Sequence, residues 1–418
     1  AADALVRTLN ALPPSPRTGA ALQLAVTTGD NVDNMQDNEL RAFLRLLSGG
    51  EVDIDSGGAA YEGMQDGSVP WAWAPDDPDN EWGLAHGFPT VPGLLARGLA
   101  TFVADGLRIP WLTCFGNHDG LIQGRVPAST ELMAITVGHR KVTRVRAGDV
   151  ADFTDDPLPA FADLERVVGA DPRRRPLTRA DYIAAHFTDG GLPHGHGFTA
   201  SNRRDGTAYY AYDDVPGVRI IVLDTTNPAG IFEGSIDRPQ FAWLRDQLSQ
   251  AQSQDRLVLI ASHHPRTSMT NNRPVPGTQP DAGERVLGPQ IGELLHEFDH
   301  VTAWLSGHIH RNRVTAHWGP SGLGGYWEIS TSSVMDWPCQ GRIVELVDNL
   351  DGTLSLMLTT VDHPSALRPG SIDDIDGLAA WHRELAANDP FGVGGPEAHG
   401  TPADRNVELV LADPRRRR

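Results

Sequence analysis

The chain alternates short apolar runs, rich in β-branched residues, with segments whose apolar residues recur at helical spacing. The apolar runs predict strands at residues 22–27, 109–114, 218–224, 256–261 and 300–305. The helical spacing predicts helices at residues 1–12, 38–47, 238–248 and 289–298. Because strands that alternate with helices are typical of βαβ units, we expect an α/β fold around a largely parallel sheet.

The pattern changes after His310, where apolar runs follow one another with no helical segment between them. These runs predict strands at residues 326–331, 342–347 and 353–360. The last two are joined by Asn-Leu-Asp-Gly at residues 349–352, and such residues favour a tight turn between paired strands. We therefore expect antiparallel strands in this part of the chain.

Two long stretches, residues 49–106 and 138–214, look inserted into this framework because both exceed the length of a simple strand-to-helix loop. Loops of that size often cover or shape a site. The first stretch holds Trp71, Trp73 and Trp82, which could stack on a nucleobase or a lipid. Packing of the stretch onto the body of the protein is the simpler interpretation. We expect one catalytic domain over residues 1–418, with residues 362–418 as a C-terminal extension.

Composition and charge exclude several classes of protein. Hydrophobic residues make up 40% of the chain, which excludes wholesale disorder. No apolar run reaches the roughly 18 residues of a membrane span, so none is expected. The net charge of −19 disfavours a nucleic-acid-binding surface. The two cysteines, Cys114 and Cys339, are too few for a disulfide framework and wrongly spaced for a thiolate zinc site.

Polar side chains stand directly after four of the predicted strands. They are Asp30 and Asp33 in GDNVD, Asn117, His118 and Asp119 in GNHD, His263 and His264 in SHHP, and His308 and His310 in GHIH. The carboxyl edge of a parallel sheet is where α/β proteins place their ligands, so we expect these side chains to meet there.

Carboxylate, carboxamide and imidazole groups are the ligands of divalent metals such as Mn²⁺ and Zn²⁺. A carboxylate can also bridge two ions with its two oxygens. Each motif alone has an ordinary structural explanation, because Gly-Asp-x-x-Asp is common in turns and a histidine pair can end a strand. The four motifs together, each closely following a strand, favour a metal site.

The four blocks and their order resemble the calcineurin-like metallophosphoesterase superfamily over roughly residues 20–360. Segments such as WEIS, SSVMDWP and GHGFT are similar to a bacterial, mainly actinobacterial subgroup of that family. The resemblance implies a four-layer α/β/β/α sandwich, in which helices flank two mixed β-sheets. It also implies hydrolysis of a phosphate mono- or diester by two divalent metal ions, such as Mn, Zn or Fe, that hold a hydroxide between them.

The resemblance also implies a role for each block. Asp30 would bridge the two ions, Asn117, His263 and His308 would complete the second metal, and His310 would bind the first. His118 would lie near the leaving-group oxygen, with Asp33 hydrogen-bonded behind it. An imidazole oriented by a carboxylate is a suitable proton donor near neutral pH.

Three further residues are assigned: His264 and Asp119, which stand beside these blocks, and His196, which lies in the second long stretch. We expect His264 and His196 to be substrate-binding residues, although each could instead belong to the surrounding structure. For Asp119, support of the turn around Asn117 is favoured over a direct role.

One block of the family pattern is missing. It is a D-x-H motif at the end of a first strand, and it would supply two ligands to the first metal. Residues 1–29 contain no histidine. Residues 1–12 look like the helix that follows that strand, and a right-handed crossover needs a parallel strand before this helix. We therefore expect an upstream segment carrying the strand and the motif.

Three functions stay open at this point. They are a metal-dependent phosphoesterase, which we favour, a degenerate one-metal or non-enzymatic metal- or phosphate-binding relative, and a hydrolase of another ester. The expected partner of the favoured function is a small phosphate ester. Relatives in the subgroup often begin with a twin-arginine leader, which favours export, and no such signal is visible in this sequence.

Overall fold

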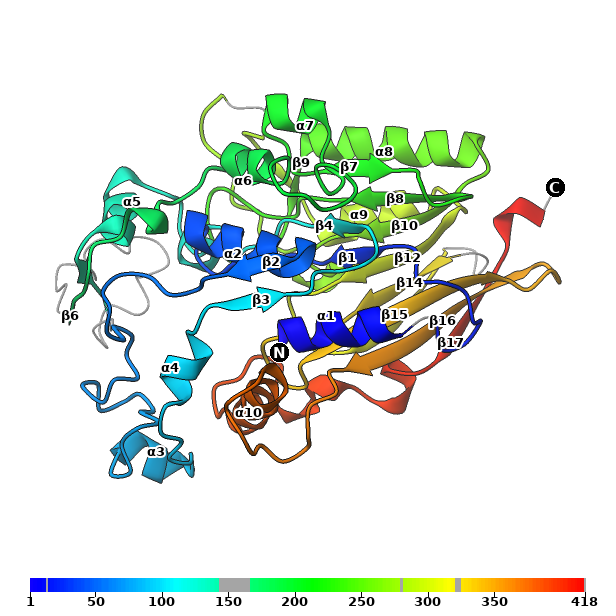
Figure 1. Cartoon of the computed structure of the whole chain (residues 1–418). Coiled ribbons are helices and arrows are strands. Elements are labelled where there is room, and N and C mark those ends of the chain that lie inside the picture. Colours follow the sequence, from blue (N-terminus) through cyan, green and yellow to red (C-terminus); the bar gives the residue numbers. More distant parts are fainter. Residues whose placement is uncertain (13, 143–165, 279–280, 320–324, 417–418) are drawn as a thin grey trace.

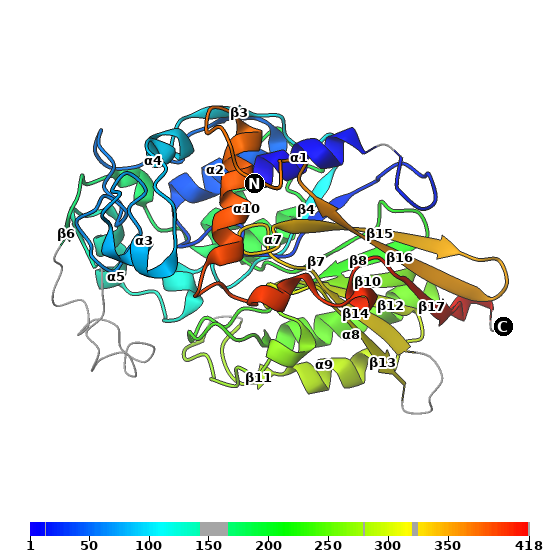
Figure 2. The same ribbon diagram turned by 90° about the horizontal axis from the view of Figure 1, so that it is seen from below.

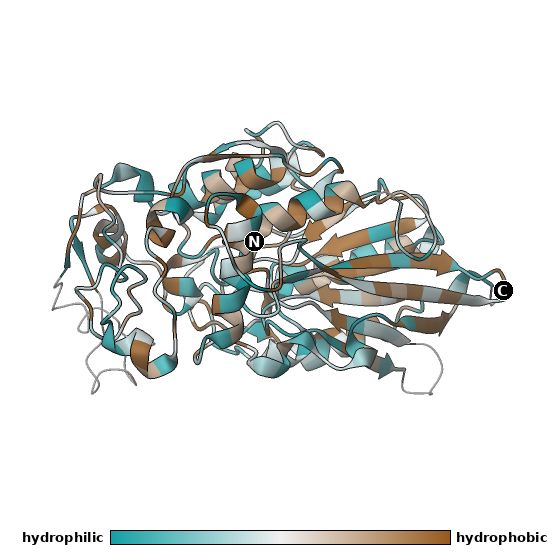
Figure 3. Ribbon diagram, turned by 60° about the horizontal axis from the view of Figure 1, so that its bottom comes forward, coloured by the Kyte–Doolittle hydropathy of each residue, from teal (hydrophilic) through white to brown (hydrophobic). Residues whose placement is uncertain are grey.

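The computed structural model describes residues 1–418 except 13, 143–165, 279–280, 320–324 and 417–418. Its centre consists of two β layers with helices on both outer sides (Figure 1). Hydrophobic residues lie along the strands between these helical layers (Figure 3).

The larger β layer is a six-stranded sheet with the order β13-β14-β12-β10-β8-β7. Its strands are β7 (Tyr210–Tyr212), β8 (Val218–Val222), β10 (Leu257–Ala261), β12 (Val301–Ser306), β13 (Arg313–Trp318) and β14 (Gly325–Ser330). The four central strands run parallel, and the edge strands β7 and β13 are antiparallel to their neighbours. The largely parallel sheet expected from the sequence is therefore confirmed, but β14 was wrongly expected to lie among antiparallel strands only.

The second β layer contains a short parallel pair and an antiparallel group. The pair is β1 (Ala25–Thr27) and β4 (Trp111–Thr113), and both strands are shorter than the sequence predicts. The group has the order β15-β16-β17, with bounds Gln340–Asp348, Thr353–Asp362 and Glu408–Ala412. The predicted hairpin of β15 and β16 is confirmed.

Helices α8 (Arg238–Ser253) and α9 (Gly288–Leu295) cover the outer face of the six-stranded sheet. Helix α8 begins where the Asp237 side chain accepts a hydrogen bond from the Gln240 N–H group (2.6 Å). Its residues Leu244 and Leu248 are fully buried against the sheet. Burial of two such side chains stabilises this layer by about 3–6 kcal/mol.

Helices α1 (Ala2–Ala11) and α2 (Asp37–Ser48) cover the second β layer. In α2 the buried residues Leu40, Leu44 and Leu47 lie on one face, as the helical spacing predicts. Helix α1 packs through Leu5 on β15 and β16. The four layers are therefore helix, strand, strand and helix, as the resemblance to the family predicts.

The remaining elements flank these layers, several of them at the end opposite the turn between β15 and β16 (Figure 2). The helices are α3 (Glu81–His86), α4 (Leu94–Gly98), α5 (Thr130–Val137), α6 (Arg179–Ala185), α7 (Ala200–Asp205) and α10 (Ile375–Asn388). Two-stranded pairs are formed by β2 (Gly50–Val52) with β3 (Phe102–Ala104), β5 (Arg140–Lys141) with β6 (Arg166–Val167), and β9 (Ile236–Asp237) with β11 (Arg285–Val286). None of the helices in the described ranges is both long and apolar enough to cross a membrane.

Two sequence expectations about these outer parts need correction. The second stretch is not wholly an insertion, because β7 joins the main sheet and Tyr182 and Phe198 lie in the main core. The part after His310 is not free of helices, since it contains α10. In the first stretch Trp73 is buried and packs beside Trp82 and Phe88, which fits a packing role.

Candidate metal centre

Asp30 lies in the turn that follows β1, in contact with the turn that follows β4. Its backbone φ of 53° is in the left-handed region. The carboxylate Oδ1 accepts a hydrogen bond from the His118 backbone N–H group (2.8 Å). Burial opposes ionisation of this group, but the charges of His263 and His118 outweigh burial and hold the pKa of Asp30 well below its usual range. Asp30 is therefore an anion at neutral pH.

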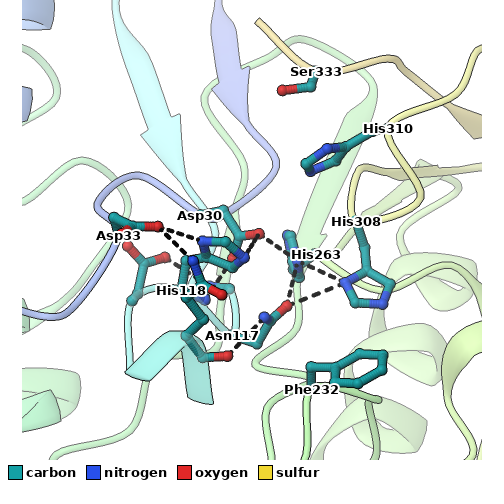
Figure 4. Close-up of polar contacts among 12 residues, drawn as sticks. Asp30, Asp33, Asn117, His118, Phe232, His263, His308, His310 and Ser333 are labelled. Atoms are coloured by element: carbon teal, nitrogen blue, oxygen red, sulfur yellow. Dashed lines mark hydrogen bonds and ion pairs between the residues drawn. The ribbon is translucent and has the colours of Figure 1, made fainter. Parts of the chain in front are cut away.

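Four donor atoms from four different strand ends converge at one place, and one of them belongs to Asp30 (Figure 4). His263 Nε2 lies 3.2 Å from Asp30 Oδ2, 3.0 Å from Asn117 Oδ1 and 3.2 Å from His308 Nδ1. Asn117 Oδ1 lies 3.1 Å from His308 Nδ1. The structure thus brings together Asp30, Asn117, His263 and His308, as the strand-end argument predicts.

This spacing fits a single divalent cation. Donor atoms bound at about 2.1 Å around one ion lie about 3.0–3.4 Å from one another in octahedral or tetrahedral geometry. The carboxylate, amide oxygen and imidazole nitrogens all present lone pairs to the same point, so a cation there would relieve their mutual repulsion. This mixture of O and N donors suits Mn²⁺, Zn²⁺ or Fe²⁺.

Internal hydrogen bonds orient two of the histidines. His263 Nδ1 donates to the Thr28 carbonyl oxygen (2.8 Å), which leaves Nε2 of the neutral ring free to bind a metal. Burial, with a smaller contribution from the neighbouring His263, lowers the pKa of His308 to about 3, so His308 is neutral and able to act as a ligand. His310 lies on the other side of this group (Figure 4), and its Nδ1 lies 2.6 Å from Asp336 Oδ2.

His118 forms a pair with Asp33 at the edge of the same site. His118 Nδ1 donates to Asp33 Oδ1 (2.9 Å), and its Nε2 lies 3.8 Å from Asp30 Oδ2. Burial lowers the pKa of His118, but the hydrogen bond to Asp33 and the charge of Asp30 outweigh it and raise the pKa above its usual value. The hydrogen bond from His118 correspondingly lowers the pKa of Asp33. The expected arrangement, with a carboxylate behind an imidazole, is present.

Asp119 supports the two turns that carry Asp30 and Asn117. Its carboxylate accepts hydrogen bonds from the backbone N–H groups of Asn31 (3.0 Å), Val32 (3.1 Å) and Gly116 (2.7 Å). Burial and the charge of Asp30 raise the pKa of Asp119 to about 8. The side chain is fully buried, so its contacts agree with the supporting role favoured from the sequence.

The ring nitrogens of the two residues expected to bind substrate are hydrogen-bonded to other parts of the protein. His264 is fully buried, with Nδ1 2.7 Å from Thr225 Oγ1 and Nε2 donating to the Phe232 carbonyl oxygen (2.8 Å). His196 is also fully buried, stacks on Trp111 at 3.5 Å between ring centroids, and binds Asp189 through Nε2 (2.7 Å). The expectation is corrected for both, because neither ring has a nitrogen left for a substrate.

Sequence reasoning missed three partners of the site. The Thr28 carbonyl oxygen orients His263, Asp336 orients His310, and Gln123 Nε2 donates to Asp33 Oδ1 (3.1 Å). A backbone carbonyl leaves no signal in a sequence. Asp336 stands 26 positions after His310. Its only signal in the sequence is its place in the SSVMDWP segment, which resembles the family.

The family model for calcineurin-like phosphoesterases matches residues 84–312, which is more than half of the chain. This chain belongs to the calcineurin-like phosphoesterase family. The matched range includes Asn117, His263, His308 and His310, whereas Asp30 lies before it. The expected family is therefore confirmed, and with it the α/β fold class.

Several proteins similar to this calcineurin-like phosphoesterase are known. A manganese-dependent ADP-ribose/CDP-alcohol diphosphatase from Arabidopsis thaliana is 23% identical over 198 residues, which cover 37% of this chain and 59% of the relative. A dimetal phosphatase from Danio rerio is 14% identical with a TM-score of 0.28, covering 39% of this chain and 62% of its own. A putative 5'-nucleotidase from Staphylococcus aureus is 13% identical with a TM-score of 0.24, covering 42% and 33%. The match thus spans about three fifths of the first two relatives.

Proposed function

We propose that this protein hydrolyses phosphate esters with the help of divalent metal ions. The observation that carries the proposal is the convergence of Asp30, Asn117, His263 and His308 beside the His118–Asp33 pair. Membership of the calcineurin-like phosphoesterase family supports the same reaction. The relative from Arabidopsis thaliana supports manganese as the first metal to test, and a nucleoside diphosphate compound as a first substrate class.

The four donors would hold one ion, and Asp30 with His310 would contribute to a second. Bound divalent ions supply positive charge for the phosphoryl oxygens and activate water as a nucleophile near neutral pH. The chain itself places the anionic Asp30 where it would bind these ions, and it keeps His308 neutral. Without such cations, a phosphate would meet a carboxylate-rich site in a protein of net charge −19, and binding would be weak.

His118 is the proton donor in this proposal. Asp33 accepts the Nδ1 hydrogen, so the protonated ring presents its second hydrogen at Nε2, on the side of Asp30. The raised pKa of His118 keeps a larger share of the ring protonated at neutral pH. A proton held at this atom can pass to the oxygen of the departing group, which stabilises the developing charge.

A second candidate function is binding of one metal ion without turnover. In the described part of the chain, only His263, His264 and His308 form a group of three or more acidic, histidine or cysteine side chains with donor atoms within 4.8 Å of one another. Because both His264 nitrogens are hydrogen-bonded within the protein, the group leaves a single site around His263 and His308. A protein with that site alone would bind Mn²⁺ and show little hydrolysis.

Metal analysis and turnover measured on the same preparation distinguish the two functions. The protein is loaded with Mn²⁺, Zn²⁺ or Fe²⁺ and assayed with p-nitrophenyl phosphate, bis(p-nitrophenyl) phosphate, ADP-ribose and CDP-choline. His263→Ala should lose bound metal and turnover, whereas His194→Ala, a change at an exposed histidine, should keep both. Stoichiometric metal binding with no hydrolysis of any of the four compounds would leave the binding function and refute the enzyme.

A further inference from the structure

The backbone and the side chain of Gln123 contact two different parts of the candidate site. The Asn117 side chain donates a hydrogen bond from Nδ2 to the Gln123 carbonyl oxygen (3.0 Å). The Gln123 side chain donates from Nε2 to Asp33 Oδ1 (3.1 Å). Asn117, Asp33 and His118 lie next to one another in Figure 4. One residue therefore joins a candidate metal ligand to the carboxylate behind His118.

Gln123 reaches both partners because the chain folds back over Asn117. In the turn Leu121–Gly124, the backbone φ values of Ile122 and Gln123 are 51° and 56°, both in the left-handed region. A methyl group at Gly124 would lie 2.7 Å from the Asn117 carbonyl oxygen, so the two segments are in direct contact. The turn therefore fixes Gln123 against the metal ligand.

The backbone carbonyl of Gln123 determines which end of the Asn117 amide faces the metal centre. A carbonyl oxygen only accepts hydrogen bonds, so the NH₂ group of Asn117 has to point toward it. The amide oxygen Oδ1 then points the other way, where it lies 3.0 Å from His263 Nε2 and 3.1 Å from His308 Nδ1. A reversed amide would present hydrogen atoms to a cation and could not bind it.

The side-chain amide of Gln123 restrains Asp33. The Asp33 side chain is 59% exposed, so water can reach it and other rotamers are open to it. Its Oδ1 accepts hydrogen bonds from both His118 Nδ1 (2.9 Å) and Gln123 Nε2 (3.1 Å). Gln123 thus holds, from the fixed turn, the same oxygen atom that orients the His118 ring.

The orientation of His118 decides whether its proton can reach the oxygen of the departing group. Its Nε2 lies 3.8 Å from Asp30 Oδ2, beside the candidate metal centre. Proton transfer requires the two heavy atoms to come within hydrogen-bond reach, and small misplacements reduce the rate strongly. A carboxylate that rotated freely would let the ring turn away. Asp33, when restrained by Gln123, keeps Nε2 on the side of Asp30.

We propose that Gln123 is a positioning residue that aligns the proton donor with the metal centre. Its side-chain amide holds Asp33 against His118, and its backbone carbonyl turns the Asn117 oxygen toward the ion. The inference rests on the proposed hydrolysis of phosphate esters and adds a residue to it. A substitution of Gln123 removes the side-chain contact and keeps the backbone carbonyl, so it should impair proton donation and leave metal binding intact.

Gln123→Met tests the side-chain contact, because methionine keeps the length of glutamine and lacks the amide. Turnover is measured at saturating Mn²⁺ with a nitrophenyl ester and with the corresponding phenyl ester, whose poorer leaving group depends more on a proton donor. With the phenyl ester kcat should fall at least about tenfold, and with the nitrophenyl ester it should stay within about twofold. Gln254→Met, at an exposed position, is the matched control and should change neither value. Bound Mn²⁺, measured by mass spectrometry, should be unchanged in both variants.

A second measurement does not depend on hydrolysis. In metal-free protein that contains isotope-labelled histidine, the magnetic resonance signal of the His118 Nδ1–H group is assigned by its loss in His118→Ala. A hydrogen bond to a restrained carboxylate protects this hydrogen from exchange with water. In Gln123→Met the hydrogen should exchange at least about fivefold faster than in the wild type, and in Gln254→Met at the wild-type rate.

Several results would overturn the proposal. Equal losses of kcat with both esters would indicate a general structural effect, and loss of bound Mn²⁺ in Gln123→Met would indicate an effect on the metal ligand. Unchanged kcat with the phenyl ester, or unchanged exchange at His118, would show that Asp33 needs no support from Gln123.

Two further outcomes are also decided. If the wild type hydrolyses no ester, the proposed function fails, and the exchange rate alone decides the role of Gln123. If Gln123→Met does not fold, Gln123→Asn replaces it, because asparagine tolerates the left-handed conformation and its amide, shorter by one methylene group, cannot reach Asp33.

Discussion

Replacing Gly116 with alanine tests whether the turn after β4 holds Asp30 where a metal ion needs it. A methyl group at Gly116 would lie 2.3 Å from the Asp30 backbone nitrogen and 2.3 Å from Asp30 Oδ1. Ordinary van der Waals contact begins at about 3.4 Å. The two turns must therefore separate by about 1 Å to admit the methyl group.

A separation of 1 Å is large compared with the tolerance of a metal site, in which ligand distances hold to about 0.2 Å. Changes to residues that support metal ligands cost about 10–100-fold in metal affinity. We expect Gly116→Ala to lower Mn²⁺ affinity by at least about tenfold. Overpacking should also destabilise the fold by about 1–3 kcal/mol.

Titration calorimetry with Mn²⁺, together with chemical denaturation in the absence of metal, measures the two effects separately. Gly190→Ala is the matched control, because a methyl group there meets nothing within 4 Å and the backbone φ is not positive. The control should retain both metal affinity and stability. Wild-type Mn²⁺ affinity in a folded Gly116→Ala protein would contradict the assignment of Asp30 as a ligand.

Three further outcomes follow from the site. His118→Ala should reduce turnover of esters with poor leaving groups at least about a hundredfold while metal content, measured by mass spectrometry, stays unchanged; loss of metal would contradict its assignment as a non-ligand. Asp33→Asn should lower the pKa of His118, because its hydrogen bond to Asp33 raises that pKa, so activity should fall at a lower pH on the alkaline side of the pH–rate profile; an unshifted alkaline limb would contradict the pairing. Removal of metal with a chelator should abolish turnover and lower the melting temperature, since saturation at 100 times Kd stabilises by about 2.7 kcal/mol, and Mn²⁺ should restore both.

The central strands were predicted from the sequence better than the strands at the edges of the sheets. Strands β8, β10 and β12 are central and continuously apolar, so their pattern stands out from the surrounding loops. Strand β13 (Arg313–Trp318) was missed because an edge strand carries charged and polar residues on its exposed side. Strand β17 and helix α10 were missed in the C-terminal segment, which was expected only as an extension.

The candidate site was predictable because its donors come from the ends of neighbouring strands. Once β1, β4, β10 and β12 are placed in two adjacent layers, Asp30, Asn117, His263 and His308 have to approach one another. The substrate-binding role predicted for His196 was wrong, because this residue does not follow the end of a strand. A histidine in a Gly-rich segment looks the same in sequence whether it faces a site or, as here, stacks on Trp111 in the core.

The backbone of the site carries information that the sequence could not supply. Asp30, His308 and His310 have φ values of 53°, 64° and 48°, a region that non-glycine residues adopt at a cost of about 1–2 kcal/mol each. Glycine would adopt the same turns without this cost. A turn that served only stability would therefore favour glycine at these positions. Each of the three positions instead carries a carboxylate or imidazole that lies in the candidate metal centre, so the cost of the turn accompanies a side chain that the proposed site uses.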